Sequence, residues 1–345
     1  MDDVITERKK IQEKFFSEGI PRLWCPILTH YTDEGKIDRE RMKKHIDYLR
    51  PYVSSFLAPG STGDGWEMDA EESKGLLDFL LKEAKKKDFW IMVGVLRTGM
   101  GKALDSIQNT VDRLLDSENV TIQDFVDNRI CGFTVTPPKG SDLLQEEIYL
   151  ELEKILETGY PVSLYQLPQV TENEMTPETV KKLADKYANF YFLKDTSGED
   201  RVVLSNVGRQ VFMVRGAEGD YARWINGNDG KYDGLLLSTA NCFASKLSQI
   251  IEKIERGKEE AAVRLSERIT TVISKVFKLV EDLPYGNKFT NANKLIDHHY
   301  AYGREALEVE PPMTHSGNRL SKESIKKTGE ILAEYDLLHD NGYLE

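Results

Sequence analysis

A short apolar run with strand character is followed by a longer segment of helical periodicity eight times in succession between residues 23 and 257. The apolar runs lie at residues 23–28, 55–58, 90–95, 132–135, 161–165, 191–193, 211–214 and 234–237. Eight strand–helix units in roughly 240 residues match the count and length of a (β/α)₈ TIM barrel. The alternation therefore predicts such a barrel, with its active site at the carboxyl ends of the strands.

The segments that flank this pattern are helical in character. We expect residues 1–19 to form a leading segment, with a helix at 4–17, and residues 20–257 to form the catalytic barrel. Residues 258–345 contain no low-complexity break and are predicted to form a C-terminal helical extension packed on the barrel. One long apolar face of that extension comprises Leu265, Ile269, Val272, Val276 and Val280.

The net charge and the lengths of the apolar runs argue against several classes of binding partner. The 345 residues carry a formal net charge of −12, which argues against nucleic acid or an anionic membrane, because both need a basic face. No apolar run approaches the roughly 20 residues that span a bilayer, and the first residues lack the features of a signal peptide. We therefore expect a cytoplasmic protein with no membrane partner.

The cysteines and histidines are not spaced in the sequence as the ligands of a metal site usually are. The three cysteines are far apart in apolar sequence and are predicted to be reduced core thiols. His298 and His299 are adjacent, so on a helix their side chains would point about 100° apart rather than toward one ion. We expect neither a metal site nor a cofactor.

Lys194 is the residue with the most distinctive position. It follows the apolar run 191–193, and Ser197 with Asp200 three residues later has the form of a helix N-cap, so Lys194 should end a buried strand. A lysine there is costly unless it is paired or deprotonated, since burial disfavours the ammonium form. It could reach solvent or pair with Asp195. As a neutral amine it would attack carbonyl groups, which predicts a Schiff-base lysine.

A second candidate site segment is the loop at residues 59–65, which follows the second predicted strand. Its glycines flank Ser61 and Thr62, so the main chain can approach a ligand closely and consecutive N–H groups can bind a carboxylate. A plain turn remains the alternative.

Two helices on either side of this loop have clear start signals in the sequence. Asp38 is expected to be the N-cap of one, and Asp69 with Glu72 is expected to form the capping box of the other.

Four motifs resemble those of one enzyme family. They are Gly60-Ser61-Thr62-Gly63, Tyr165-Gln166-Leu167-Pro168, Leu193-Lys194-Asp195-Thr196-Ser197-Gly198 and Ser238-Thr239-Ala240-Asn241. In order and context they resemble the dihydrodipicolinate synthase/N-acetylneuraminate lyase family of class I aldolases, over roughly residues 20–300. The resemblance implies a TIM-barrel lyase whose partners are pyruvate, or another 2-oxo acid, and an aldehyde.

The resemblance also implies roles for individual residues. Lys194 would form the imine with C2 of the 2-oxo acid, and Tyr165 would relay the proton. The loop residues Ser61, Thr62, Gly63 and Asp64 would bind the 2-oxo acid, with its carboxylate held by the first two. Glu218 and Ser238 would face the distal part of the pocket and bind hydroxyl groups of the partner. The family resemblance further implies a homo-oligomer, a tetramer or a dimer.

Four positions depart from the family pattern, the first being Asp64, which stands where members usually have a glutamate. Pro138 and Lys139 stand where many members carry tyrosines of the proton relay, and Val170 stands where the synthase places an arginine for its second substrate. An apolar side chain cannot bind a carboxylate. A sugar-acid-like or neutral aldehyde partner is therefore expected. The alternatives are 4-hydroxy-tetrahydrodipicolinate synthase, a 2-keto-3-deoxy sugar acid dehydratase, and a catalytically silent 2-oxo acid-binding protein.

Overall fold

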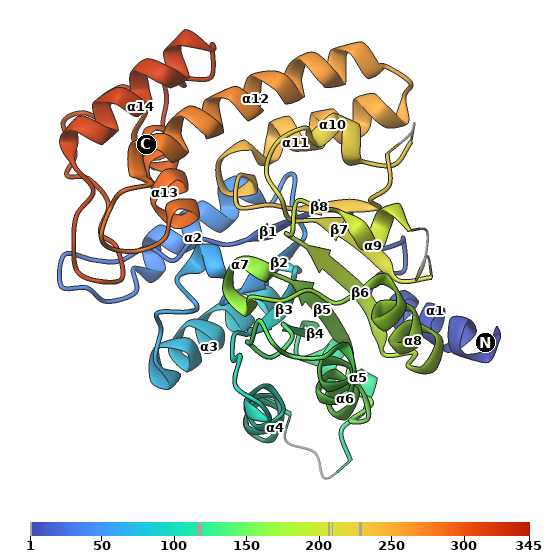
Figure 1. The fold of residues 1–345 in the computed structure, drawn as a ribbon. Coiled ribbons are helices and arrows are strands. Elements are labelled where there is room, and N and C mark those ends of the chain that lie inside the picture. The colour runs from blue at the N-terminus through green and yellow to red at the C-terminus, as the bar shows by residue number, and fades with distance from the viewer. Residues whose placement is uncertain (1, 116–118, 206–207, 209, 228–229) are drawn as a thin grey trace.

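The computed structural model describes residues 2–115, 119–205, 208, 210–227 and 230–345. Its centre is a barrel of parallel strands, with the C-terminal helices gathered on one side (Figure 1). Among the described helices, none is long and apolar enough to cross a membrane.

The described chain forms eight strands that close into a barrel in sequence order, each parallel to its neighbours, with β8 paired to β1. They are β1 (Leu23–Pro26), β2 (Ser55–Ala58), β3 (Trp90–Val95), β4 (Ile130–Val135), β5 (Val162–Gln166), β6 (Phe190–Asp195), β7 (Phe212–Arg215) and β8 (Gly234–Leu236). The strands are short apolar runs that helices cover on the outside, which explains their near-continuous burial. The predicted (β/α)₈ barrel is confirmed.

Helices connect the strands along the outside of the barrel. They are α2 (Arg39–Leu49), α3 (Ala70–Lys87), α4 (Lys102–Leu114), α5 (Ile122–Asp127), α6 (Gln145–Leu156), α7 (Pro168–Thr171), α8 (Pro177–Lys186), α9 (Arg201–Leu204), α10 (Tyr221–Trp224) and α11 (Ala240–Glu255). Two predicted caps are present: the Asp38 side chain accepts from the Arg41 N–H, and Asp69 with Glu72 forms the capping box of α3. These caps set where the helices begin after the loops that carry the site.

The predicted cap after β6 was wrong. Helix α9 begins at Arg201, and its N-cap residue Asp200 has a left-handed backbone, with φ of 56°, and no side-chain capping bond. The Ser197 hydroxyl instead donates to Asp195 Oδ1 at 2.7 Å and accepts from the Asp200 N–H at 3.3 Å. The Ser197 hydroxyl is therefore bonded within a local turn at the end of β6 and does not cap α9. In the connection between α4 and β4, residues 116–118 lie outside the described chain, and the rest contains α5.

Helix α1 (Asp2–Phe15) covers the amino-terminal end of the barrel. Phe15 and Phe16 are buried against Trp90 and Trp24, with ring centroids 5.6 and 5.7 Å apart, and both tryptophans lie near the start of their strands. The Arg8 guanidinium donates from Nε to the Phe190 carbonyl at 2.7 Å. The amino end is thus closed by packing, which leaves the carboxyl end for the site.

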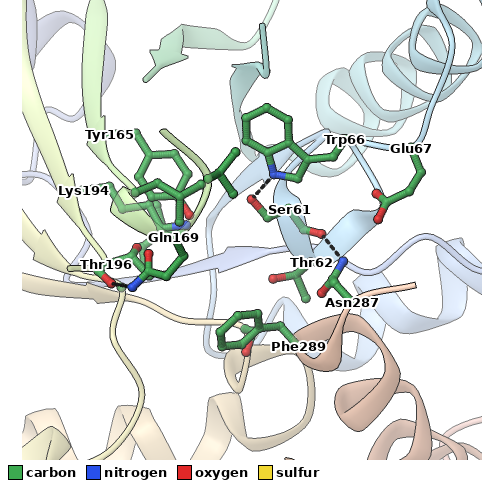
Figure 2. A pocket seen from close by; sticks show the side chains of 15 residues that line it. Ser61, Thr62, Trp66, Glu67, Tyr165, Gln169, Lys194, Thr196, Asn287 and Phe289 are labelled. Atoms are coloured by element: carbon green, nitrogen blue, oxygen red, sulfur yellow. Dashed lines mark hydrogen bonds between the residues drawn. The ribbon is translucent and has the colours of Figure 1, made fainter. Parts of the chain in front are cut away.

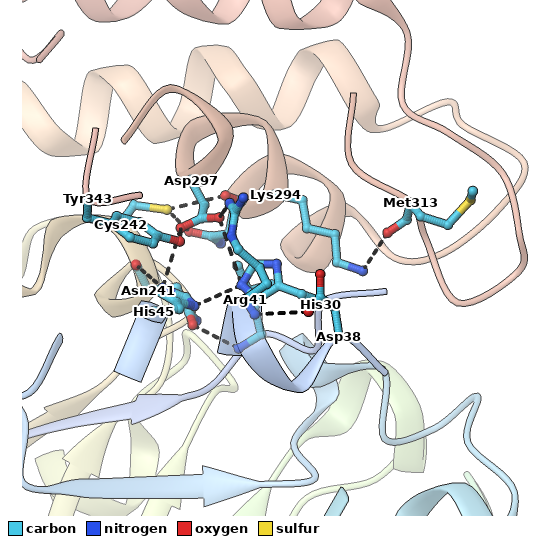
Figure 3. Close-up of polar contacts among 12 residues, drawn as sticks. His30, Asp38, Arg41, His45, Asn241, Cys242, Lys294, Asp297, Met313 and Tyr343 are labelled. Atoms are coloured by element: carbon cyan, nitrogen blue, oxygen red, sulfur yellow. Dashed lines mark hydrogen bonds and ion pairs between the residues drawn. The ribbon is translucent and has the colours of Figure 1, made fainter. Parts of the chain in front are cut away.

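The C-terminal extension comprises α12 (Glu259–Val280), α13 (Lys288–Tyr302), the short turn η2 (Gly303–Glu305) and α14 (Lys322–Glu334). Its apolar face joins the same hydrophobic core as the barrel strands. A buried polar network links it to the barrel (Figure 3): Asp297 accepts from Arg41 of α2 at 2.6 Å and from the Tyr343 hydroxyl at 2.8 Å. The extension is therefore anchored to the barrel by both apolar packing and paired charge.

Candidate active site

Lys194 is the next-to-last residue of β6 and is 4 % exposed. In the sheet it is paired directly with Tyr165 of β5. Residues paired across neighbouring strands point to the same side of the sheet, and the Lys194 Nζ lies 4.1 Å from the centroid of the Tyr165 ring. The predicted nucleophile and the predicted proton relay are thus neighbours at the carboxyl end of the barrel.

The alternative explanations for Lys194 do not hold in the structure. The side chain is buried rather than extended into solvent, and within the described chain no carboxylate oxygen lies within 4.0 Å of its Nζ. Asp195 faces the other way: its Oδ1 accepts from the Ser197 N–H at 2.9 Å, and burial raises the pKa of this carboxyl. Lys194 is therefore buried and has no ion-pair partner in the described part of the chain.

Gly216 makes room for the Lys194 side chain. A Cβ atom at residue 216 would lie 2.9 Å from Lys194 Cε and closer still to the Thr196 hydroxyl oxygen. Real Cβ atoms do not approach other atoms that closely, so any larger residue would push the lysine from its place. The glycine after β7 is therefore a steric requirement of this site.

The loop after β2 forms the turn η1 (Ser61–Gly63) at the edge of the same site. Helix α13 holds its main chain: Asn287 Nδ2 donates to the Ser61 carbonyl at 3.1 Å, and the Thr290 hydroxyl donates to the Thr62 carbonyl at 2.9 Å. These bonds use carbonyl oxygens, so they do not occupy the N–H groups of Ser61 and Thr62. The C-terminal extension thereby orients the loop predicted to bind a carboxylate.

A pocket of about 650 Å³, which includes the open space at its mouth, joins these elements (Figure 2). Its polar or small lining residues are Ser61, Thr62, Glu67, Tyr165, Gln169, Lys194, Thr196, Gly216, Ser238 and Asn287. Its apolar lining residues are Trp66, Leu167, Val170, Leu236 and Phe289. Of the eight predicted site residues, five line this pocket: Ser61, Thr62, Tyr165, Lys194 and Ser238.

Three predicted site residues do not line the pocket. Asp64 is 1 % exposed and pairs with Lys294 Nζ at 3.2 Å, while the Gly63 carbonyl accepts from the Thr29 hydroxyl at 2.8 Å. Glu218 lies behind Ser238, from which it accepts at 2.6 Å, and it also accepts from the Thr239 N–H at 3.0 Å. Both carboxylates are already bonded within the protein, Asp64 through Oδ2 and the half-buried Glu218 through both oxygens. Gly63, Asp64 and Glu218 therefore lie outside the lining of this pocket, and their contact with substrate stays a prediction.

Several lining residues were missed from the sequence. Trp66 and Glu67 follow the glycine-rich loop directly, so their closeness to Ser61 was a usable signal. The Trp66 Nε1 indeed donates to the Ser61 hydroxyl at 2.8 Å. Asn287 and Phe289 lie more than 220 residues from that loop, beside the start of α13, and nothing local to them predicts their role.

A second polar cluster, formed by His30, His45 and Asp297, was also missed. Their ligand atoms lie within 4.8 Å of one another, a grouping that could hold a metal ion. However, Asp297 is already bonded to Arg41, whose positive charge repels a cation. The ring of His45 bonds the Asn241 carbonyl at 2.8 Å, and burial lowers the pKa of both histidines. The cluster is best described as the polar link between barrel and extension (Figure 3).

Known proteins resemble the chain at both sequence and fold level. The model of the dihydrodipicolinate synthetase family matches residues 131–307, just over half of the chain. A 4-hydroxy-tetrahydrodipicolinate synthase of Bacillus velezensis is 24 % identical over 262 residues, covering 75 % of this chain and 84 % of that protein.

Two solved structures share the fold. A variant of the 2-keto-3-deoxygluconate aldolase of Sulfolobus solfataricus has a TM-score of 0.69 and 16 % identity, covering 92 % of this chain and 96 % of that one. YagE of Escherichia coli, solved with pyruvate, has a TM-score of 0.69 and 19 % identity, covering 91 % of this chain and 98 % of that one. The matched segment contains the Tyr165 and Lys194 motifs that meet at the pocket, and the chain belongs to the dihydrodipicolinate synthetase family.

Proposed function

We propose that the protein is a pyruvate-dependent Schiff-base aldolase or lyase, with Lys194 as the residue that forms the imine. The observation that carries this proposal is a buried lysine at a strand end, without a carboxylate partner in the described chain, beside Tyr165 and a small-molecule pocket. Membership of the family supports the reaction class. The retained pair of Lys194 and Tyr165 argues against a catalytically silent binding protein.

The reaction begins when the neutral Lys194 amine attacks C2 of pyruvate and water leaves, which forms the imine. The imine withdraws electrons, so C3 can lose a proton to give an enamine. The enamine carbon then bonds to the aldehyde carbon, and the aldehyde oxygen takes up a proton. Hydrolysis of the imine releases the product, and the reverse sequence cleaves the same bond.

Tyr165 is the group we assign to proton transfer beside the imine nitrogen. Its ring centroid lies 4.1 Å from Lys194 Nζ, and the side chain is 2 % exposed, so proton transfer is shielded from bulk water. Lys139, at one of the two positions where family tyrosines are absent, forms an ion pair with Glu172 at 2.9 Å and does not line the pocket. The proton relay of this protein therefore depends on Tyr165, with water as its partner.

Ser61 and Thr62 bind the carboxylate of the 2-oxo acid in this proposal. Both line the pocket, and α13 holds their carbonyl oxygens away, so their N–H and hydroxyl groups can face the ligand. Hydrogen bonds from such a fixed loop orient C2 for attack without further ordering. This role accounts for the position of the loop next to Lys194.

Val170 lines the pocket where the synthase pattern expects an arginine. Aspartate semialdehyde then lacks a charged partner for its carboxylate, a contact commonly worth about 1.5–3 kcal/mol. We expect kcat/KM for at least one uncharged aldehyde to exceed that for aspartate semialdehyde by about tenfold or more. Product formation from pyruvate and each aldehyde, followed by mass, measures this. Equal use of aspartate semialdehyde would restore the synthase as the better assignment.

Borohydride trapping tests the central step. Pyruvate and borohydride should add a permanent mass to the protein, and peptide mapping should place that mass on Lys194 alone. Lys294, which is also buried, serves as the internal control and should stay unmodified. No adduct, or an adduct elsewhere, contradicts the proposal.

We further propose that residues 20–257 act as the catalytic barrel and residues 258–345 as an extension that completes the site, after the leading segment 1–19. The positions of Asn287 and Phe289 in the pocket support this division of roles. The family resemblance supports a homo-oligomer, either a tetramer or a dimer, in the cytoplasm. Native mass measurement and cell fractionation test these two statements.

A further inference from the structure

Ser61 is held from two sides within the loop that we assign to the carboxylate of the 2-oxo acid. Trp66 Nε1 donates to its hydroxyl oxygen at 2.8 Å, and Asn287 Nδ2 donates to its carbonyl oxygen at 3.1 Å (Figure 2). Ser61, Trp66 and Asn287 all line the pocket that contains Lys194. Hydrogen bonds within the protein therefore fix both the side chain and the main chain of Ser61.

A tight turn brings Trp66 back beside Ser61. The N–H groups of Glu67 and Met68 both donate to the Asp64 carbonyl, each at 3.1 Å. Asp64 has a left-handed backbone with φ of 62°, a conformation that aspartate adopts more readily than most residues. The chain reverses at this residue, which places the indole, five residues after Ser61, against the serine hydroxyl.

The bond from Trp66 decides what the Ser61 hydroxyl can do. An indole N–H is only a donor, so the serine oxygen must accept, and the serine proton must point elsewhere. Within the described chain no protein group accepts that proton. The Ser61 hydroxyl is therefore available to donate to a ligand in the pocket.

Ser238, the other serine that lines the pocket, is bonded differently. Its hydroxyl accepts from Asn293 Nδ2 at 3.0 Å and donates to Glu218 at 2.6 Å. The Ser238 proton is thus committed to a carboxylate of the protein, and the charge of Glu218 would repel a second carboxylate there. Of these two serines, Ser61 is the one whose proton is available to an anion.

Resting on the proposed function, we propose that Trp66 is a positioning residue for the 2-oxo acid. Its indole N–H holds the Ser61 hydroxyl so that this hydroxyl donates to the ligand carboxylate. A hydroxyl that accepts one hydrogen bond donates a stronger one, because successive hydrogen bonds polarise one another. A donor that is already fixed also needs no further ordering when the ligand binds. Trp66 therefore acts through Ser61 rather than on the reacting atoms.

The variant Trp66→Phe tests the hydrogen bond, because it keeps an aromatic ring in the pocket and removes the N–H. The assay is borohydride trapping of pyruvate on Lys194 in the full chain, measured against pyruvate concentration. The half-saturating concentration should rise about threefold to tenfold, the equivalent of one hydrogen bond. The trapped yield at saturation should stay the same, because the lysine is unchanged. An unchanged half-saturating concentration overturns the inference.

A double-variant cycle shows whether Trp66 acts through Ser61. Ser61→Ala alone should also raise the half-saturating pyruvate concentration. Trp66→Phe added to Ser61→Ala should raise it further by less than about twofold, since the hydroxyl that the indole holds is already gone. Two effects that multiply as if independent would contradict the inference.

Trp24→Phe is the matched control. Trp24 Nε1 also donates a hydrogen bond, to the Pro21 carbonyl at 2.7 Å, but it lies near the amino end of the barrel. Loss of that bond should lower the free energy of unfolding and leave the half-saturating pyruvate concentration unchanged. A rise equal to that in Trp66→Phe would assign the effect to a general loss of stability and overturn the inference.

Trapping with borohydride also separates this inference from the proposed function. If pyruvate is trapped on Lys194 with the same half-saturating concentration in the wild type and in Trp66→Phe, the Schiff-base function stands and the role of Trp66 is wrong. If the wild type traps no pyruvate on Lys194, the proposed function fails, and the role of Trp66 fails with it.

Discussion

Lys194 and Lys294 are both buried, at 4 % and 1 % exposed, and each lies over a tyrosine ring. Lys194 Nζ is 4.1 Å from the centroid of Tyr165, and Lys294 Nζ is 4.6 Å from that of Tyr31. Their partners differ. Lys294 pairs with Asp64 at 3.2 Å and donates to the Met313 carbonyl at 3.2 Å (Figure 3), whereas Lys194 has no such partner in the described chain.

This difference supports the proposal that Lys294 is a structural lysine and Lys194 the catalytic one. A buried ammonium is stable when a carboxylate and a carbonyl replace its water, and Lys294 thereby joins α13 to the end of the Ser61–Gly63 turn. In the proposed function, the amine of Lys194, which has neither partner in the described chain, is the group that attacks the carbonyl. Burial alone therefore does not distinguish the two lysines; the presence or absence of a carboxylate partner does.

Lys194→Met should give the largest effect of all on activity. Methionine has similar volume but no nucleophile, so turnover and borohydride trapping should fall below detection. Because the variant removes a buried amine without an ion-pair partner, its free energy of unfolding should be equal or higher. Denaturant unfolding and pyruvate trapping measure both. Residual trapping at the wild-type level would move the nucleophile to another residue.

Tyr165→Phe should slow turnover by about 10²–10⁴-fold, the usual contribution of a positioned proton-transfer group. The ring that packs beside Lys194 is kept, so the yield of trapped pyruvate at saturation should change little. Steady-state kinetics and the trapping yield, measured together, distinguish these effects. Turnover at the wild-type rate would remove Tyr165 from the mechanism.

Lys294→Met should lower the free energy of unfolding by about 3–5 kcal/mol, because it leaves the Asp64 carboxylate buried and unpaired. Trapping of pyruvate on Lys194 should persist in the protein that remains folded. The double variant Asp64→Asn/Lys294→Met should recover much of the loss, since it removes the buried charge. A double variant no more stable than Lys294→Met would show that the ion pair is not the cause.

The histidines around Lys294 should make stability depend on pH to a smaller extent. Burial lowers the pKa of His298 from 6.5 to about 4, and its Nε2 donates to the Ala306 carbonyl at 2.7 Å. Between pH 6.5 and 4 the unfolded chain binds a proton that the folded chain does not. Stability is therefore complete above about pH 6.5 and falls toward pH 4, by about 3 kcal/mol at most for this residue.

Urea unfolding at pH 7.5 and 4.5 measures this dependence. The His298→Asn variant should have a lower free energy of unfolding than the wild type at both pH values. Its free energy of unfolding should fall less than that of the wild type between pH 7.5 and 4.5. Leu307→Ala, at an exposed residue without a titratable group, is the control and should keep the wild-type pH dependence. If the stability difference between the two pH values is the same in His298→Asn as in the wild type, other titratable groups cause the pH dependence.

Much of the barrel was predictable because its signals are local. β2 and β3 were placed at 55–58 and 90–95, where the structure has them, since each is an apolar run between a polar turn and a helix. The caps at Asp38 and Asp69 were found for the same reason. The Ser197 cap was wrong because two local bonding patterns competed for one hydroxyl, and its sequence spacing suits both.

Family and reaction class were also predictable from the motifs around Ser61, Tyr165 and Lys194, and the family match confirmed them. These residues lie at strand ends, and a barrel brings all its strand ends to one face, so their order in the chain was enough. The positions of Asp64 and Glu218 outside the pocket lining were not predictable from local sequence. Each is a carboxylate that bonds to donors supplied from elsewhere in the fold.

The sequence by itself thus determined the barrel, the lysine at the end of β6 and its tyrosine neighbour, because those depend on periodicity and strand order. Only the tertiary structure decided which lysine lacks a carboxylate partner and which side chains form the pocket wall. Lys294 lies 230 residues from Asp64, and Phe289 lies more than 220 residues from Trp66. Pairings across such separations are chosen by the packing of α13 on the barrel, and no local pattern encodes them.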